Sequence, residues 1–172
     1  MIDKFPKNCK YDFKRKKTTI VLRGKRSPRY MTRMTGIKFE ELRIGMFAET
    51  TNIMTEEVVV AFADVSGDRN PVHLNAEYAS TTPFKERIVH GALLGAYISA
   101  LVGMELPGPG SIGVSLTLKF KRPVKLGAVV TTRVEVKTLN ERMAFATLTC
   151  ICSVNKKTAI EGETVVYVPR QN

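Results

Sequence analysis

The sequence is poor in the side chains that form disulfides and bind metals. Its 172 residues include three cysteines and two histidines. An odd cysteine count without an apolar secretory signal argues against a disulfide framework. Only His73 and His90 could join the cysteines as metal ligands, and their spacing matches no zinc motif. Cys150 and Cys152 lie two apart in a strand-like run, so we expect both to face the same side of a sheet, buried or half-buried.

A long apolar run is also absent. The longest one, from Gly91 to Met104, is interrupted by Ser99 and falls short of the roughly 18 residues that a membrane span needs. We interpret it as a buried core helix. The composition, 44% hydrophobic and 25% charged, is ordinary for a soluble globular protein.

Acidic residues are scarce at the beginning of the chain. Residues 1–35 hold 12 of the 27 lysines and arginines but only 2 of the 16 acidic residues, so nearly all of the net charge of +11 lies there. The remainder is close to neutral and gives no electrostatic signature of nucleic-acid binding. We therefore expect a basic, disordered extension over residues 1–35 and one domain over residues 36–172. A targeting segment, or an arm that binds nucleic acid or a membrane surface, is the alternative for the extension.

The pattern after Gly36 predicts an α+β domain. A strand over Phe47–Ile53 precedes a helix that Thr55 caps and Gly67 ends. A polar loop follows, and then a short helix over Ala76–Ser80 that is capped by Asn75. The apolar run from Gly91 predicts a helix buried on every side. Four more strands are expected, over Ile112–Phe120, Val129–Thr138, Ala144–Val154 and Ala159–Val168. An antiparallel sheet wrapped around a long central helix fits this order.

Three groups near the middle of the chain could act on one substrate. Asp68 and His73 are five residues apart in a loop that Pro71 makes rigid. A carboxylate and an imidazole aimed at one point can hold and deprotonate a water molecule. Gly91 opens the predicted helix, where an unpaired backbone N–H can polarise a carbonyl oxygen. This combination suits addition of water to a double bond conjugated to a thioester, and the reverse elimination.

A family resemblance rests on two runs, Ser66-Gly67-Asp68-Arg69-Asn70-Pro71-Val72-His73 and Ile88-Val89-His90-Gly91. Together they resemble the signature of the MaoC-like family, which includes the (R)-specific enoyl-CoA hydratases and mitochondrial hydroxyacyl-thioester dehydratases. The likeness covers roughly residues 37–169. It implies a hotdog fold, a homodimer with the thioester bound at or near the subunit boundary, and no metal or redox cofactor. Coenzyme A or acyl carrier protein would carry the substrate.

The same resemblance implies roles for individual residues. Asp68 and His73 would be the catalytic pair, and the Gly91 amide would donate to the oxyanion. Asn70 would brace the loop or contact the water, Ser99 matches a family position near the active site, and Asn70, His90 and Ser99 are together predicted as substrate-binding positions. From the residues alone, His90 could instead orient the turn at Gly91, and Ser99 could be a packing residue.

Other activities and compartments stay open from the sequence. A hotdog thioesterase would need a carboxylate near the helix start but not the Asp68 and His73 pair, and a non-catalytic acyl-binding module would need neither. We expect a cytoplasmic protein, with the mitochondrial matrix as the alternative.

Overall fold

The computed structural model describes residues 18–19 and 35–171. The prediction that residues 1–35 form a basic, disordered extension lies largely outside these residues. Within the extension, Thr18–Thr19 form the short strand β1, which pairs antiparallel with the next strand so that Thr18 lies opposite Thr50.

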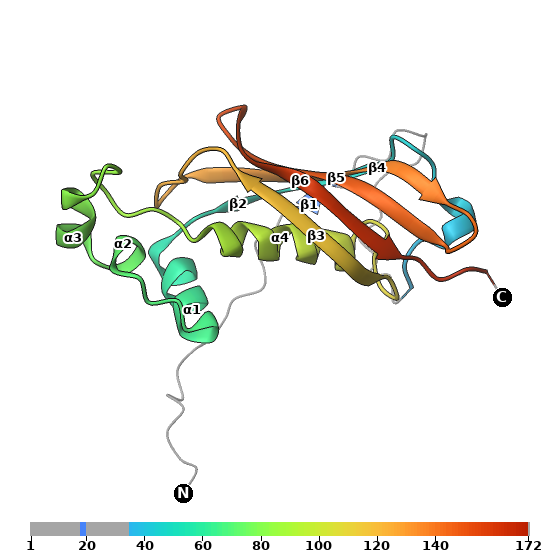
Figure 1. Cartoon of the computed structure of the whole chain (residues 1–172), viewed down its shortest axis with the longest axis horizontal. Coiled ribbons are helices and arrows are strands. Elements are labelled where there is room, and N and C mark those ends of the chain that lie inside the picture. Colours follow the sequence, from blue (N-terminus) through green and yellow to red (C-terminus); the bar gives the residue numbers. More distant parts are fainter. Residues whose placement is uncertain (1–17, 20–34, 172) are drawn as a thin grey trace, which may run out of the picture.

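One antiparallel sheet carries the fold, with strand order β1-β2-β4-β5-β6-β3 (Figure 1). The predicted strands are confirmed, each boundary within two residues. They are β2 (Phe47–Ile53), β3 (Ile112–Phe120), β4 (Val129–Asn140), β5 (Phe145–Val154) and β6 (Lys157–Tyr167). The sheet curves over one helix, which confirms the predicted α+β hotdog architecture.

The helices lie in two places (Figure 1). A single-turn 3-10 helix, η2 (Phe39–Glu41), precedes β2. Three short helices gather at one end of the sheet, while α4 runs along its concave face. The helices are α1 (Glu56–Ser66), α2 (Pro71–Leu74), α3 (Ala76–Thr81) and α4 (Gly91–Met104). None of the described helices is long and apolar enough to cross a membrane.

Side-chain caps explain where the short helices begin. The Thr55 hydroxyl accepts from the Val58 N–H, and the Asn75 side chain accepts from the Tyr78 N–H, as the sequence predicts. Helix α2 was expected to be loop. It forms because the Asn70 side chain caps it and Pro71 occupies its first position, where a missing N–H has no cost.

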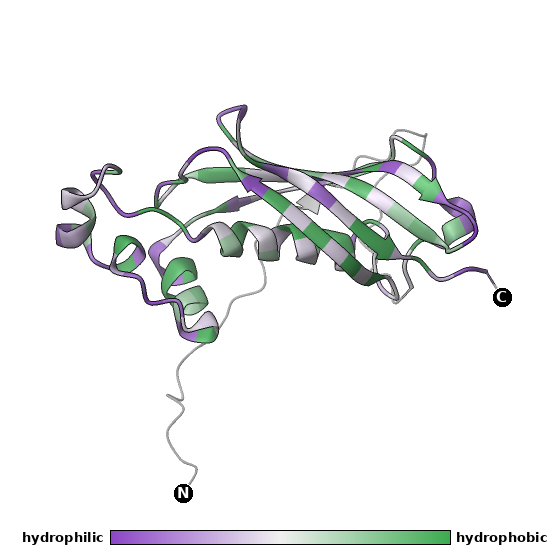
Figure 2. Cartoon of the chain, in the orientation of Figure 1, coloured by the Kyte–Doolittle hydropathy of each residue, from purple (hydrophilic) through white to green (hydrophobic). Residues whose placement is uncertain are grey.

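Helix α4 supplies the centre of the core. Its residues Leu94, Ile98 and Leu101 are buried against the sheet, together with the inward residues of the strands. Figure 2 shows hydrophobic and hydrophilic residues alternating along the strands. The prediction that α4 is buried on every side is wrong, because Ala92, Ala96, Ser99 and Ala100 are exposed. Alanine counts as apolar in a sequence, but its small side chain exposes little apolar surface to water. The run of apolar residues therefore could not distinguish this exposed face from the buried one.

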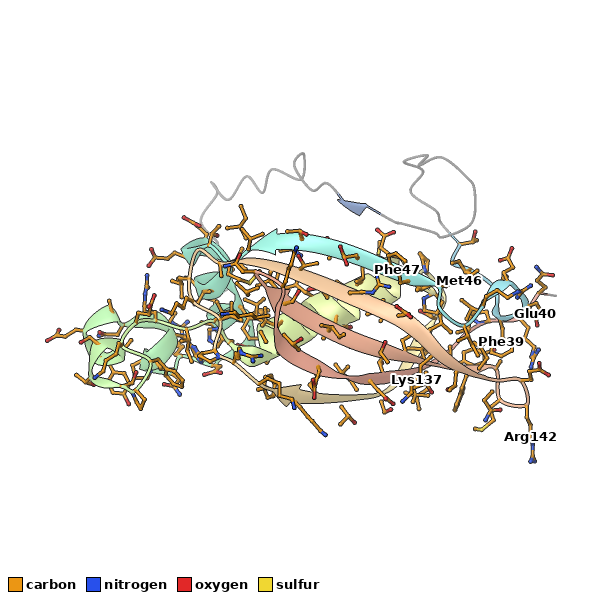
Figure 3. All side chains as sticks on the ribbon, turned by 90° about the horizontal axis from the view of Figure 1, so that it is seen from above. Phe39, Glu40, Met46, Phe47, Lys137 and Arg142 are labelled. Atoms are coloured by element: carbon orange, nitrogen blue, oxygen red, sulfur yellow. The ribbon has the colours of Figure 1, made fainter. Side chains whose placement is uncertain are left out.

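The two faces of the sheet differ in the way that alternation predicts. Inward-facing Cys150 and Cys152 are fully buried, as expected. Outward-facing residues of β4 form ion pairs, including Lys137 with Glu163 at 2.6 Å between Nζ and Oε1. Lys137 lies toward the end of the sheet opposite the short helices (Figure 3). The outer face of the sheet therefore carries charged side chains that are exposed to solvent.

Candidate active site

The loop that carries Asp68 begins at the end of α1. Gly67 adopts a left-handed conformation, with φ of 76°, and ends the helix. The Asp68 carboxylate accepts a hydrogen bond from the Asn70 N–H at 3.2 Å, which holds the following turn. Asp68 remains exposed to solvent.

His73 is placed by α2 and by a contact with a distant strand-like segment. Its Nδ1 lies 2.8 Å from the Ile88 carbonyl oxygen. Because a carbonyl can only accept, Nδ1 carries a proton, and in the neutral ring Nε2 carries the lone pair. His73 is 9% exposed and lines a cleft, so a lone pair on Nε2 is available to a small molecule there.

The Asp68 carboxylate and the two imidazoles converge. One ligand atom from each of Asp68, His73 and His90 lies within 4.8 Å of the other two. At that separation one water molecule can accept from or donate to two of the groups at once. The structure therefore brings together the pair that the sequence proposed for water activation.

His90 lies beneath this pair and is 1% exposed. Its Nε2–H donates to the backbone carbonyl of Asp68 at 2.9 Å. Its ring stacks on His73, with centroids 3.8 Å apart, and also contacts Phe62. Nδ1 is buried and has no hydrogen-bond partner in the described part of the chain. His90 thus joins the Asp68 loop to the start of α4 and packs against His73 without lining the cleft.

Gly91 is the first residue of α4, and two backbone hydrogen bonds fix the approach to it. The Ile88 N–H donates to the Val72 carbonyl at 3.3 Å, and the Val89 N–H donates to the Val124 carbonyl at 2.7 Å. A Cβ on Gly91 would lie 2.5 Å from Cε1 of Phe120. A side chain at this point would have to displace the Phe120 ring, a constraint that the sequence did not reveal.

A cleft of about 430 Å³ opens at this end of α4, and we call it the site cleft. Its walls come from α2, the start of α4 and the end of β3. His73 and Gly91 both line it, so an acyl carbonyl at the Gly91 N–H would lie in the same space as the His73 ring. Lys121 and Arg122 stand at its rim; Lys121 pairs with Glu161 at 2.8 Å, and Arg122 donates to the Thr158 carbonyl. Sequence analysis had no signal for Phe84, Phe120 or the Ile88 carbonyl as parts of the site.

The other predicted substrate-binding residues lie apart from this cleft. Asn70 is exposed, and its side chain accepts from the Val72 N–H. Ser99 lines a second cleft of about 360 Å³ farther along α4, which we call the distal cleft. Among the described residues, Asn70 therefore supports the loop, and Ser99 belongs to a different part of the groove.

Asp68, His73 and His90 also form the one group of potential metal ligands in the described residues. Two of the four ring nitrogens are already used as donors to carbonyls. The nitrogens that remain, with one carboxylate, could supply at most three ligands, which resembles an open catalytic site more than a closed structural one.

Comparison with known families identifies the domain. Residues 41–155 match the model of the MaoC-like domain. The chain belongs to the MaoC-like family. Among curated relatives, the 3-hydroxybutyryl-CoA dehydratase of Methylorubrum extorquens is 42% identical over 77% of this chain and 85% of its own length. The (R)-specific enoyl-CoA hydratase of Rhodospirillum rubrum is 45% identical over 76% of this chain and 91% of its own.

Solved MaoC-like structures agree with the fold. The unliganded R-hydratase PhaJ1 of Pseudomonas aeruginosa superimposes with a TM-score of 0.75 at 43% identity, covering 79% of this chain and 88% of the other. The (R)-hydratase of Aeromonas caviae gives a TM-score of 0.74 at 42% identity, covering 76% and 99%. The family resemblance drawn from the two sequence motifs is confirmed.

Proposed function

We propose that this MaoC-like protein is an (R)-specific hydro-lyase that reversibly adds water to trans-2-enoyl thioesters to give (R)-3-hydroxyacyl thioesters. The observation that carries the proposal is the convergence of the Asp68 carboxylate and the His73 imidazole within 4.8 Å beside the open start of α4. Relatives at 42–45% identity that carry hydratase and dehydratase names support it.

The proposed mechanism uses one water held between Asp68 and His73. As the water oxygen bonds to the β-carbon, this pair takes one of its protons, and the C–C π electrons move toward the thioester carbonyl. The Gly91 N–H donates to the oxygen where the negative charge collects. Return of a proton to the α-carbon restores the carbonyl and completes the addition. The chain's own residues suffice for each step, so we propose no metal or redox cofactor.

We propose a homodimer as the working form. Strand β3 is the last strand of the sheet, and its outer edge is unpaired by the described residues. Its exposed side chains include Ile112, Val114, Leu116 and Phe120, which are 44–63% exposed. An edge with this much apolar surface favours pairing with another copy. Because Phe120 also covers Gly91, such an interface would adjoin the site cleft.

The carrier of the acyl group is proposed from the rim of the site cleft. Lys121 and Arg122 place positive charge where a phosphate-bearing thiol would enter, a feature that coenzyme A and the prosthetic group of acyl carrier protein share. The bacterial relatives support a cytoplasmic protein. The mitochondrial matrix is the alternative compartment, because a relative from Arabidopsis thaliana that is 29% identical to this chain is a mitochondrial enzyme.

The test is turnover of crotonyl-CoA and of the matching acyl-carrier-protein thioester. We expect loss of the conjugated-enoyl absorbance and an (R)-3-hydroxyacyl product on chiral analysis. Replacing Asp68 by Asn keeps the shape of the side chain but removes the base, and should lower kcat on the order of 10²-fold or more. Asp64→Asn is the matched control, since Asp64 is an exposed carboxylate on α1 that pairs with Arg69 in the described part of the chain. Release of free thiol without hydration would favour a thioesterase and contradict the proposal.

A further inference from the structure

One arginine contacts both of the helices that lead to the proposed catalytic pair. Nη1 of Arg87 donates to Oε1 of Glu56, the first residue of α1, at 2.8 Å. The same nitrogen donates to the carbonyl of Leu74, the last residue of α2, at 3.3 Å. A terminal guanidinium nitrogen carries two hydrogens, so it can serve both acceptors at once. Arg87 therefore links the start of α1 to the end of α2.

These two helices carry the groups proposed to hold the water. Helix α1 ends at Ser66, and Asp68 follows it after the cap at Gly67. His73 lies in α2, a helix of four residues, which is too short to be stable through its own hydrogen bonds. The position of His73 relative to Asp68 therefore depends on the contacts that α2 makes with other segments.

Arg87 and the residue after it bond to three consecutive residues of α2. The Ile88 N–H donates to the Val72 carbonyl at 3.3 Å. The Ile88 carbonyl accepts from Nδ1 of His73 at 2.8 Å, and Arg87 reaches the Leu74 carbonyl. The contact between His73 and Ile88 holds a proton on Nδ1, which leaves the lone pair on Nε2. The tautomer proposed to act on water is thus set by the residue next to Arg87.

The ion pair of Arg87 differs in burial from the others among the described residues. The Arg87 side chain is 20% exposed, less than that of any other ion-paired residue in this set. Exposed ion pairs contribute little, whereas a partly buried guanidinium with two acceptors has a defined geometry. The Leu74 carbonyl belongs to the group of acceptors that a helix leaves unpaired at its end, so the bond from Arg87 also satisfies α2.

We propose that Arg87 is a positioning residue, which sets the place and the tautomer of His73 by holding the Ile88 carbonyl and the end of α2 against α1. Arg87 does not line the site cleft, so it acts through His73. Without this contact the imidazole is free to adopt either tautomer, and only the form protonated at Nδ1 has an Nε2 that can accept a proton from water. The kinetic consequence rests on the proposed hydratase function, whereas the tautomer is a property of the protein without substrate.

The first experiment reads the histidine tautomers of the full-length protein by nitrogen-15 NMR. His73 and His90 are the only histidines in the sequence, so ring-labelled histidine gives signals from two rings, and His73→Asn assigns them. At pH 8 we expect Nδ1–H for His73 and Nε2–H for His90, because each of these nitrogens lies beside a carbonyl. Arg87→Gln should convert His73 to a mixture of both tautomers and leave His90 unchanged.

The second experiment measures kcat and KM for crotonyl-CoA. Arg87→Gln should lower kcat by about tenfold to a hundredfold with KM close to that of the unmodified protein, because small displacements of catalytic groups have effects of that size. Arg87→Lys keeps the charge without the planar fork and should recover part of the loss. Arg133→Gln is the matched control, since Arg133 is also a partly buried, ion-paired arginine but lies on β4 beside Glu49 and Glu135. It should leave both the tautomers and kcat unchanged.

The outcomes separate positioning from general stabilisation and from the function itself. An unchanged His73 tautomer in a folded Arg87→Gln variant would overturn the proposal, as would equal changes at His73 and His90. If that variant does not fold, Glu56→Ala cuts the link to α1 and should shift the His73 tautomer less but in the same direction, and no shift would count against the proposal. Absence of turnover by the unmodified protein would instead overturn the hydratase function, while the tautomer result would still decide the role of Arg87.

Discussion

His90 holds the Asp68 loop by its backbone, because Nε2–H of His90 donates to the Asp68 carbonyl at 2.9 Å. The two residues are far apart in sequence, and His90 immediately precedes the Gly91 N–H that is proposed to bind the oxyanion. One buried imidazole thus joins the Asp68 loop, whose carboxylate is proposed to activate water, to the Gly91 amide that is proposed to polarise the carbonyl. The stacked His73 ring, with its centroid 3.8 Å away, is fixed by the same side chain.

Replacement of His90 should therefore reduce turnover through geometry. A Gln at this position can place an N–H near the position of Nε2, whereas Leu cannot. We expect His90→Leu to lower kcat by on the order of 10²-fold with a smaller change in KM, because small displacements of catalytic groups have effects of that size. His90→Gln should recover a large part of the loss. Steady-state kinetics on crotonyl-CoA provide the measurement.

A purely structural role for His90 would give a different pattern. In that case both variants would lose thermal stability in proportion to their loss of activity. Melting temperatures measured beside the kinetics distinguish the two, and equal kcat for Gln and Leu at equal stability would contradict the positioning role.

Gly91 offers a steric test of the oxyanion position. A Cβ there would lie 2.5 Å from the Phe120 ring, so Gly91→Ala should displace the ring or the start of α4 and greatly reduce activity. Adding Phe120→Ala to this variant removes the obstacle and should restore part of the activity. Activity of the double variant is compared with that of Phe120→Ala alone. If Gly91→Ala alone were as active as the parent, the start of α4 would not be the constrained position inferred here.

The fold was largely predictable because its signals are local. Alternation along β4 and β5 and the caps at Thr55 and Asn75 each depend on a few neighbouring residues. The one-turn helix α2 was missed because four residues are too few to show periodicity. The exposed stripe of α4 was missed because Ala92 and Ala96 count as apolar whether they are buried or not.

Only those residues of the candidate site that lie within one short sequence motif were predictable. Asp68 and His73 lie close in sequence, so their convergence followed from one short loop. The contacts of His73 with the Ile88 carbonyl and of His90 with the Asp68 carbonyl join a side chain to a distant backbone atom. Any residue has a carbonyl, so no sequence pattern marks these partners.

The two buried thiols should be inert in the folded protein. Burial raises the pKa of Cys150 to about 12, and burial also raises the pKa of Cys152. At pH 8 both are protonated, and a thiol reacts as its thiolate. In a Cys9→Ser background, we expect no reaction with an aromatic disulfide reagent under native conditions and two reactive thiols in denaturant. Fast native labelling would show that the core around α4 opens.

Removal of metal ions should leave the activity unchanged. The proposed chemistry uses water held by Asp68 and His73, and the same atoms are spaced closely enough to bind a cation. Prolonged dialysis against a chelator should therefore change kcat by less than about twofold, which is within the effect expected of a change of medium alone. Added Zn²⁺ would compete with the catalytic water for the three ligand atoms and should inhibit, less strongly in Asp68→Asn, which offers a weaker oxygen ligand. The measurement is initial rate against metal concentration, with total metal determined by elemental analysis. Loss of activity on chelation and its recovery with one equivalent of metal would contradict the metal-free mechanism and would assign Asp68, His73 and His90 to a metal centre.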